Sequence, residues 1–363
     1  MNRKWMWIVI SVLAVVGLLL GGFGCKAPAP TPTPTATPTP TATPTPTAAK
    51  VIELKWYWEL AYGTDNLVCH WWMDEVEKQT GGRVKFNRIQ GGALGSIADT
   101  PLLVKNRVTN IGLVTAVYNP GLYPVSTVLV LPFLTPNQTA ISLAAQDLMQ
   151  NPALQAEYTA QNSMVLFHYF SEPMQIVSHV KATTLDELKP LKIRAHGGGA
   201  AAAAAAGLTP VAVPWPELAT ALERHVIDAA IVPVPSVARD AGLHDICKYA
   251  LEVPIYYFLY TNAINLDDWN ALPADIQQIM LDVAKEAPEK NVEFFEEAGV
   301  GAWSDFAKAG VERVTWSQAE LDKFTELGGA PVWKLWVVDR GNEGLPGQEI
   351  FDQFRSAITE HGG

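Results

Sequence analysis

The chain has 363 residues, and its composition already excludes several classes of protein. Apolar residues make up 48% and charged residues 17%, so the chain can bury about two hydrophobic cores and is not disordered overall. Lys and Arg number 26 against 37 Asp and Glu, a net charge of −11. This acidic balance argues against nucleic acid as a partner, because neutralising phosphates needs a basic face. No long apolar run follows residue 25, so the bulk of the chain is not a channel or a transporter.

The first 25 residues have the pattern of an export signal. Arg3 and Lys4 precede the apolar stretch 5–20, and small residues then lead to Cys25. A Cys at this place resembles a bacterial lipobox, so we predict a lipoprotein signal peptide over 1–25 with lipidation of Cys25. An uncleaved membrane helix is the alternative. Either way, the rest of the chain is expected outside the cytoplasm, tethered to the outer face of the cytoplasmic membrane, in the periplasm or at the cell surface.

Residues 26–50 form a tract rich in Thr and Pro. Because Pro fixes φ and removes hydrogen-bond donors, this tract is expected to be disordered linker in extended, polyproline-like conformations. At about 3.1 Å per residue it reaches roughly 70 Å. We interpret it as a spacer between the membrane and a globular head.

The head begins with alternating strand-like and helix-like segments. Polar and apolar residues alternate from Ile52 to Glu59, which is typical of a strand, and Thr64 is a candidate N-cap for the next helix. This order of elements predicts an α/β fold with a parallel sheet. The predicted elements are a strand at 52–59, a helix from 64 to Gly81-Gly82, a strand at 84–89, a helix at about 97–107 and a strand at 111–114.

The middle of the chain repeats the pattern and ends in a long helix. Pro273 suits a first helical position, and apolar residues then recur at helical spacing, while Pro288 is expected to kink or interrupt this helix. Two α/β lobes with a ligand cleft between them are the natural interpretation. Strands are predicted at 164–170, 174–180, 191–195, 210–213 and 226–232, and helices at 200–206 and 217–224.

Motifs for most catalytic and cofactor chemistries are missing from the sequence. It contains no GxSxG, HExxH, CxxC or Walker A pattern, and its seven His are scattered, so neither a metal nor a cofactor is predicted. Residues 197–202 fit a loose G-x-G-x-x-A dinucleotide fingerprint. The next strand, however, ends in Pro214-Trp215 instead of the acidic residue that the fingerprint needs. Cys69 and Cys247 are expected to be buried thiols, with one disulfide as the alternative.

Arg194 is the leading candidate for a binding residue. It lies in a short apolar strand directly before a Gly-rich helix start, which places its guanidinium near the carboxyl end of the strand, where clefts form. Its planar fork can hold a carboxylate through two charge-assisted bonds, and the helix N-terminus favours an anion. A surface Arg paired with a nearby acid is the alternative. Trp58 and Trp215 lie near predicted strand ends and either line the cleft or pack in the core.

The chain resembles the substrate-binding subunit of tripartite ATP-independent periplasmic (TRAP) transporters, of the dicarboxylate-binding type. The stretches that carry the resemblance follow the family's order over roughly residues 51–300. The strongest is a Lys-Ile-Arg strand followed by a Pro-x-x-x-Glu-x-x-x-Ala-Leu helix. The stretches are EVEKQTGGRVKF, GGALGS, VTNIGLVTAVYNPGLYPVSTVLVLPFL, TLDELKPLKIRA, GLTPVAVPWPELATALERHVIDA and NLDDWNALPADIQQIMLDVAKEA.

The resemblance implies an α/β, two-lobed periplasmic-binding-protein fold with an interlobe cleft and a long helix that spans both lobes. Lobe I is expected at 51–171 plus 261–297 and lobe II at 172–260 plus 298–340, with 341–363 as a C-terminal packing segment. It also implies capture of a small organic acid, delivery to TRAP permease subunits in the membrane, no cofactor and no catalysis. By the same resemblance, Arg194 grips the ligand carboxylate, and Trp215, Thr115 and Tyr256 line the cleft.

Two departures from the family pattern suggest what the ligand is. Many members carry a second Arg where this chain has Met174, and an Asn where it has Val232. A second carboxylate buried beside these apolar residues would remain unpaired, at a cost of several kcal/mol. We therefore expect a monocarboxylate with an apolar or aromatic remainder. A neutral ligand such as a sugar, a sensor with the same fold and an extracytoplasmic enzyme are the alternatives.

Overall fold

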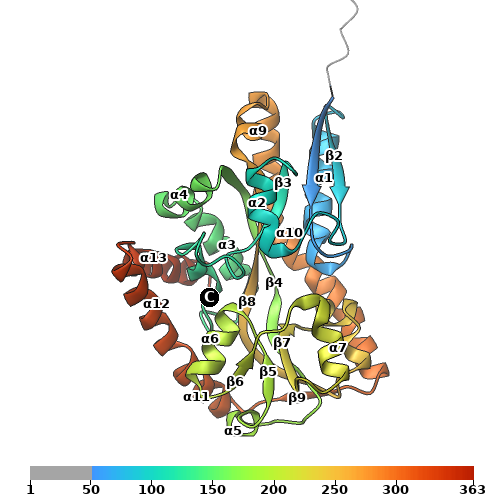
Figure 1. Cartoon of the computed structure of the whole chain (residues 1–363), viewed down its shortest axis with the longest axis vertical. Coiled ribbons are helices and arrows are strands. Elements are labelled where there is room, and N and C mark those ends of the chain that lie inside the picture. Colours follow the sequence, from blue (N-terminus) through green and yellow to red (C-terminus); the bar gives the residue numbers. More distant parts are fainter. Residues whose placement is uncertain (1–50) are drawn as a thin grey trace, which may run out of the picture. The chain divides into compact units, whose positions relative to one another are not determined.

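The computed structural model describes residues 51–363 (Figure 1). The predicted signal peptide, the linker and Cys25 lie outside the described residues. One nine-stranded sheet organises the described chain, with the strand order β2-β1-β3-β8-β4-β7-β5-β6 and β9 paired to β8. Helices pack around this sheet to form two lobes.

Lobe I is built on three parallel strands, β1 (Ile52–Tyr57), β2 (Val84–Ile89) and β3 (Ile111–Val114). All three were predicted from the sequence, as were the helices between them, α1 (Leu67–Gln79) and α2 (Thr100–Lys105). The predicted capping by Thr64 is wrong, since the N-cap of α1 is Asn66 and the Thr64 hydroxyl instead donates to Asp240 at 2.8 Å.

Lobe II contains the short strands β5 (Lys192–Arg194), β6 (Thr209–Val211) and β7 (Ala229–Pro233), and β5 pairs in parallel with both others. Helix α6 (Gly197–Ala205) follows β5, and α7 (Leu218–Glu223) follows β6. The Ala-rich run forms the predicted helix because Ala has the most favourable helix propensity.

Two long strands connect the lobes and add antiparallel pairs to the predicted parallel sheet. Strands β4 (Ser163–Ser178) and β8 (Tyr249–Asn265) pair antiparallel through the middle of the molecule (Figure 1). The segments predicted as two strands, 164–170 and 174–180, are one strand whose register shifts around Pro173. Because β4 and β8 continue through both lobes, the lobe boundaries expected from the resemblance stay a prediction.

Helix α10 (Ala274–Lys308) is 35 residues long and packs on both α1 of lobe I and α8 (Ser236–Asp240) of lobe II. Pro288 lies inside this helix without interrupting it, so the predicted interruption is wrong, while the alternative, a kink at Pro288, stays a prediction. The helix tolerates Pro288 because tertiary contacts hold it on both sides. Trp72 Nε1 donates to Met280 O at 3.1 Å, and Asn291 Nδ2 donates to Phe170 O at 2.7 Å.

The last 60 residues are mostly helical and pack back onto the rest of the molecule. Trp333 Nε1 donates to Pro132 O and Trp336 Nε1 donates to Thr127 Oγ1, both at 2.7 Å, and the Trp333 and Phe351 ring centroids lie 6.0 Å apart. These helices are α11 (Gln318–Gly328), α12 (Ala330–Asn342) and α13 (Gly347–Glu360). The remaining elements are α3 (Gln138–Leu148), α4 (Pro152–Ala160), α5 (Leu185–Leu188), α9 (Leu266–Asn270) and β9 (Glu312–Thr315).

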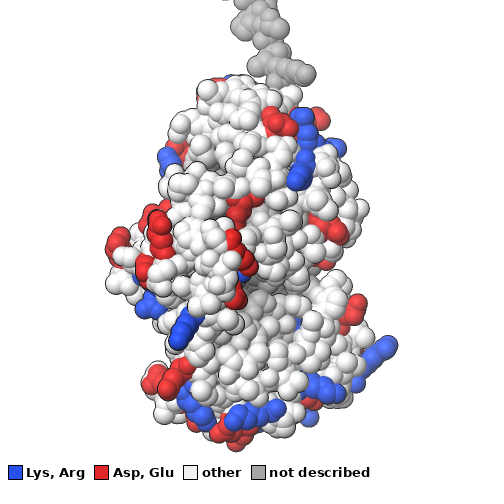
Figure 2. Space-filling view, turned by 60° about the vertical axis from the view of Figure 1, so that its left-hand side comes forward, with Lys and Arg blue, Asp and Glu red and all other residues white. Residues whose placement is uncertain are grey.

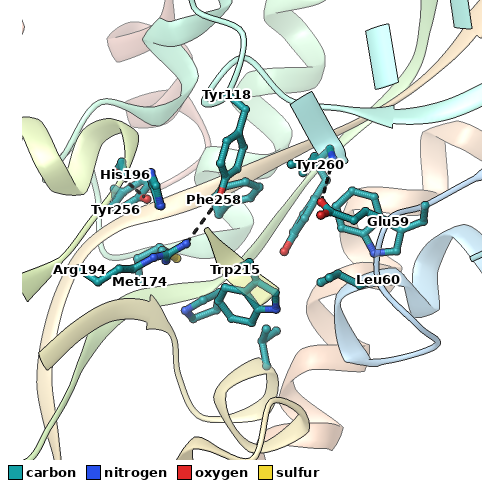
Figure 3. A pocket seen from close by; sticks show the side chains of 14 residues that line it. Glu59, Leu60, Tyr118, Met174, Arg194, His196, Trp215, Tyr256, Phe258 and Tyr260 are labelled. Carbon is teal, nitrogen blue, oxygen red and sulfur yellow. Dashed lines mark hydrogen bonds between the residues drawn. The ribbon is translucent and has the colours of Figure 1, made fainter. Parts of the chain in front are cut away.

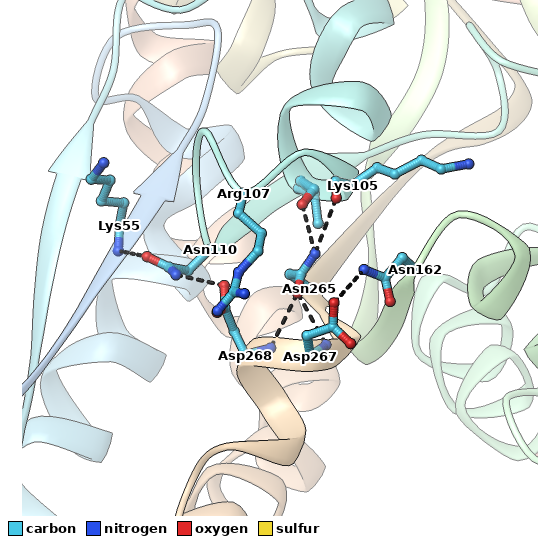
Figure 4. A network of polar contacts seen from close by, with 9 residues as sticks. Lys55, Lys105, Arg107, Asn110, Asn162, Asn265, Asp267 and Asp268 are labelled. Carbon is cyan, nitrogen blue, oxygen red and sulfur yellow. Dashed lines mark hydrogen bonds and ion pairs between the residues drawn. The ribbon is translucent and has the colours of Figure 1, made fainter.

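A polar network ties the sheet of lobe I to α9 (Figure 4). Asp268 forms an ion pair with Arg107 and accepts a hydrogen bond from Asn110 Nδ2 at 2.6 Å. Asn110 Oδ1 in turn accepts from the backbone N–H of Lys55 on β1 at 2.8 Å. Asn265 caps α9 and donates through Nδ2 to Val104 O at 3.0 Å. The charges of Arg107 and Asp268 thus have their partners within the fold.

Cys69 and Cys247 are both free and buried, so the disulfide considered as an alternative is not formed.

Among the helices of residues 51–363, none combines the length and apolar content that a membrane crossing requires. On the face drawn in Figure 2, Lys and Arg are interspersed with Asp and Glu instead of forming a single basic patch.

Candidate ligand-binding site

A pocket of about 500 Å³, part of it open to solvent, lies between the two lobes (Figure 3). Its walls are mainly aromatic and apolar, with very few charged groups. Lobe I contributes residues from the ends of its strands, lobe II contributes residues around β5 and β7, and β8 forms the back wall. The lining residues are Trp58, Glu59, Leu60, Ile97, Tyr118, Met174, Arg194, His196, Trp215, Pro233, Val237, Tyr256, Phe258 and Tyr260.

Arg194 supplies the positive charge of the pocket. It is the last residue of β5 and only 2% exposed. Its Nε donates to Val213 O at 3.1 Å and its Nη1 to Ile231 O at 3.3 Å, while Nη2 lies 3.5 Å from the Tyr118 hydroxyl. Burial lowers the pKa of Arg194. No carboxylate within residues 51–363 forms an ion pair with this guanidinium, so its charge has no partner of opposite sign in the described chain.

The glycines after Arg194 allow the chain to pack tightly beside the pocket. A Cβ at Gly198 would lie 2.0 Å from Val130 O, and one at Gly199 would lie 2.8 Å from Cε1 of Tyr256. Gly197 has φ +53°, a conformation that favours glycine. Close packing of α6 therefore explains the glycine run that matched a dinucleotide fingerprint.

Aromatic side chains surround the guanidinium. The Trp215 ring centroid lies 5.5 Å from Arg194 Cζ, within the range of a cation–π contact. The Tyr118 ring lies 5.3 Å from the His196 ring and 6.1 Å from the Phe258 ring, measured between centroids. The Tyr256 hydroxyl donates to His196 O at 3.1 Å, which fixes the back wall to the start of α6. These contacts give the pocket a flat, apolar middle section.

Trp58 forms part of the lobe I wall and is supported from behind by a buried carboxyl group. Its Nε1 donates to Asp65 Oδ2 at 3.0 Å, and its ring meets Tyr260 edge-on at 5.6 Å. Burial raises the pKa of Asp65 to about 7, with a further contribution from the negative charge of Asp240. The indole is therefore held by a hydrogen bond as well as by packing.

Glu59 follows Trp58 and supplies the negative charge of the pocket. Its Oε2 accepts a hydrogen bond from Ile97 N at 2.8 Å. Burial is the largest of the effects that raise the pKa of Glu59; the hydrogen bond from Ile97 lowers it, and the charge of Asp99 raises it further. The lining thus carries one guanidinium and one carboxyl group.

The structure brings five of the seven residues predicted from the sequence to this pocket. These are Trp58, Met174, Arg194, Trp215 and Tyr256.

The other two predicted residues, Thr115 and Val232, are fully buried and lie outside the lining. Side chains alternate along a strand, so Val232 of β7 packs into the lobe II core while its neighbour Pro233 faces the pocket. Thr115 accepts a hydrogen bond from Val117 N through its hydroxyl oxygen, and Tyr118 reaches the pocket instead.

Several lining residues were missed by the sequence analysis. Phe258 and Tyr260 follow the predicted Tyr256 at every second position of β8, so one face of this strand lines the pocket. The residues between them are also aromatic or apolar, so the sequence shows no alternation there. Glu59, Tyr118 and His196 follow strand ends or lie in loops, where sequence periodicity gives no guidance. Within residues 51–363, no group of three or more His, Cys, Asp or Glu side chains is placed to hold a metal ion.

A two-lobed fold with a small, aromatic pocket between the lobes is the architecture of a solute-binding protein. Residues 67–337 match the family described as "Bacterial extracellular solute-binding protein, family 7". The match covers most of the chain, and the protein therefore belongs to this family, as the resemblance predicted.

Named relatives agree with the family. The 2,3-diketo-L-gulonate-binding periplasmic protein YiaO of Escherichia coli K12 is 25% identical over 73% of this chain and 81% of its own length. A TRAP periplasmic solute binding protein of Desulfovibrio salexigens is 26% identical with a TM-score of 0.75, covering 86% of this chain and 97% of that one. A TRAP solute binding protein of Rhodoferax ferrireducens, in complex with copurified benzoate, is 23% identical with a TM-score of 0.78, covering 86% and 98%. This chain has the fold of the TRAP binding proteins.

Proposed function

We propose that this protein is the extracytoplasmic binding protein of a TRAP transporter and captures an organic acid through Arg194. The ligand is a monocarboxylate with an apolar or aromatic remainder. The protein delivers it to permease subunits in the membrane and performs no catalysis.

The observation that carries the proposal is the buried guanidinium without a counter-ion. A buried charge is costly unless it is paired and hydrogen-bonded, and within residues 51–363 the hydrogen-bond partners of the Arg194 guanidinium are two backbone carbonyls and one hydroxyl. A ligand carboxylate would complete the pair through charge-assisted bonds. The named relatives support this chemistry, since diketogulonate and benzoate are both organic acids.

The rest of the lining supports a single carboxylate on the ligand. Arg194 is the only Lys or Arg among the described lining residues, and Met174 occupies the place where many relatives carry a second Arg. Glu59 adds a negative charge that would repel a second carboxylate. Trp215, Phe258 and Tyr118 offer flat surfaces that suit an apolar or aromatic remainder.

The proposed mechanism is closure of the lobes around the acid. In the described state Asp240 of α8 accepts hydrogen bonds from the Thr64 N–H at 2.9 Å and from its hydroxyl at 2.8 Å, which joins lobe II to lobe I beside the pocket. Closure removes water from the Arg194–carboxylate pair and so strengthens it. The permease would recognise the closed, liganded surface.

We propose in addition that a lipid on Cys25 tethers the protein to the membrane, with residues 26–50 as the spacer. The supporting observation is the position of Cys25 directly after the apolar stretch. Metabolic labelling with palmitate in a bacterial host tests this: label is expected on the wild type and absent from Cys25→Ser. Equal labelling of both would contradict it.

Calorimetric titration against a ligand panel tests the proposed function. Benzoate and phenylacetate represent monocarboxylates, succinate represents dicarboxylates and glucose represents neutral sugars. We expect binding of the monocarboxylates, at least about tenfold weaker binding of succinate, and no binding of glucose. Tight succinate binding without monoacid binding would refute the ligand class, and glucose binding would favour a neutral-ligand protein.

A further inference from the structure

The pocket has a second polar end, remote from Arg194, that the carboxylate anchor does not use. Figure 3 shows Arg194 and Glu59 on opposite sides of the pocket, with Tyr118, Phe258 and Trp215 between them. A ligand whose carboxylate binds Arg194 therefore extends its other end toward Glu59. The groups at that end determine which remainder the pocket accepts.

Glu59 offers one unused acceptor. Its Oε2 is occupied by the Ile97 N–H at 2.8 Å, whereas its Oε1 accepts no hydrogen bond from any group in the described part of the chain. Glu59 is half-buried, so lobe closure around a ligand would leave this oxygen short of water. An acceptor without a donor in a closed site weakens binding, so a ligand donor there is favoured.

Tyr260 lines the same pocket and brings a second polar group to it. The residue is 5% exposed, and none of the hydrogen bonds of residues 51–363 involves its hydroxyl. The ring is held in place by stacking on Tyr169 at 4.9 Å and by an edge contact with Trp58 at 5.6 Å. Its orientation is thus fixed by packing, while the polar atom stays available.

We propose that the ligand carries a hydroxyl group remote from its carboxylate, and that Glu59 and Tyr260 together select for it. A hydroxyl group donates to the Glu59 carboxylate and accepts from the Tyr260 hydroxyl, which satisfies both groups at once. A purely apolar end leaves both unpaired, and a second carboxylate meets the charge of Glu59. This inference rests on the proposed function, because it needs the carboxylate at Arg194 to orient the ligand.

Calorimetric titration at neutral pH with matched acids tests the inference. The pairs are benzoate against 3- and 4-hydroxybenzoate, and phenylacetate against 3- and 4-hydroxyphenylacetate, with isophthalate as the acid with a second carboxylate. We expect at least one hydroxylated acid to bind about tenfold more tightly than its parent acid, and isophthalate to bind most weakly.

Two variants and a control assign the preference to the pair. Glu59→Gln keeps an acceptor for Ile97 but removes the charge, so the hydroxyl preference should fall about threefold and isophthalate should gain about tenfold. Tyr260→Phe should lower the hydroxyl preference about threefold. Glu53→Gln is the control. Glu53 is an exposed residue of β1, the strand that precedes Glu59, so this substitution should change neither the hydroxyl preference nor isophthalate binding. Melting curves verify that each variant is folded.

The outcomes separate this inference from the proposed function. Parent and hydroxylated acids that bind equally well would overturn the inference and leave acid binding intact. A hydroxyl preference that survives both Glu59→Gln and Tyr260→Phe would overturn the assignment to this pair. Failure of every acid to bind would overturn both.

Discussion

Arg107 in lobe I and Arg194 in the pocket show how one residue type serves two purposes. The Arg107 side chain is 54% exposed, yet the chain gives it a carboxylate partner in Asp268, which is 8% exposed. Arg194 is 2% exposed and has no carboxylate partner in the described residues. The charge that water could have solvated is paired, and the charge that most needs a partner is not.

This difference separates residues that maintain the fold from residues that bind. Asp268 and Arg107 belong to the closed network of Figure 4, where hydrogen bonds join β1, the turn before β3 and α9. Arg194 instead lines the pocket without a carboxylate partner in the described residues. A buried charge without a counter-ion lowers the free energy of unfolding of the unliganded protein. The following predictions test that comparison.

Arg194→Ala has the largest expected effect. Removing the only described lining cation should weaken monocarboxylate binding by about 100-fold, or about 2.7 kcal/mol, because the ligand charge then lies buried without a partner. Calorimetric titration with benzoate measures this effect. Arg107→Ala is the matched control and should bind as the wild type does. Wild-type affinity in Arg194→Ala would show that the anchor lies elsewhere.

Asp268→Ala should affect stability and not binding. The change leaves the Asn110 amide and the Arg107 guanidinium without their acceptor and should lower the free energy of unfolding by about 2 kcal/mol. Urea denaturation followed by tryptophan fluorescence gives this value, and a benzoate titration gives the affinity. An unchanged free energy of unfolding would contradict the structural role of Asp268. A loss of affinity as large as that in Arg194→Ala would contradict the distinction between a residue that maintains the fold and a residue that binds.

Met174→Arg should change ligand selectivity. It places a second guanidinium in the pocket, which can pair with a second carboxylate, so succinate should gain about tenfold in affinity relative to benzoate. Met174→Leu keeps the site apolar and serves as the control. If Met174→Arg binds both acids in the wild-type ratio, the absence of a second cation does not explain the ligand class.

Trp215→Ala should have the smallest effect. The indole contacts the Arg194 guanidinium at 5.5 Å and forms one wall, so its loss should weaken benzoate binding about fivefold, or about 1 kcal/mol. Trp303→Ala is the control. Trp303 lies outside the pocket lining, and its ring centroid is 4.0 Å from Arg313 Cζ. Equal effects of the two substitutions on affinity would mean that the indole at 215 has no special role.

The sequence predicts local elements of this fold well but not its long-range pairing. Strands β1 and β2 carry a period-2 pattern because one face of each is buried and the other exposed. Strand β8 is buried on both faces over most of its length, so it has no alternation to detect. Its antiparallel pairing with β4 depends on contacts between residues far apart in the chain, which no local pattern encodes.

The same limit applies to the site. Arg194 and Trp215 were candidates because of their types and their positions next to strand ends, with a surface ion pair and core packing as the alternatives, and the resemblance to the TRAP family assigned both to the cleft. Val232 lies in the core and its neighbour Pro233 in the lining, since a single-residue change along β7 moves the side chain from the core to the pocket. Glu59 follows β1 and Tyr260 lies on β8, and only the tertiary fold brings both to one pocket, so the sequence alone gave no reason to pair them.

A crystal structure of the protein with benzoate tests the central claim most directly. The account predicts that the benzoate carboxylate lies at hydrogen-bonding distance, about 2.7–2.9 Å, from the Arg194 guanidinium nitrogens, with the ring between Trp215 and Phe258. A carboxylate bound away from Arg194, with that side chain still held only by Val213 O, Ile231 O and Tyr118, would contradict it.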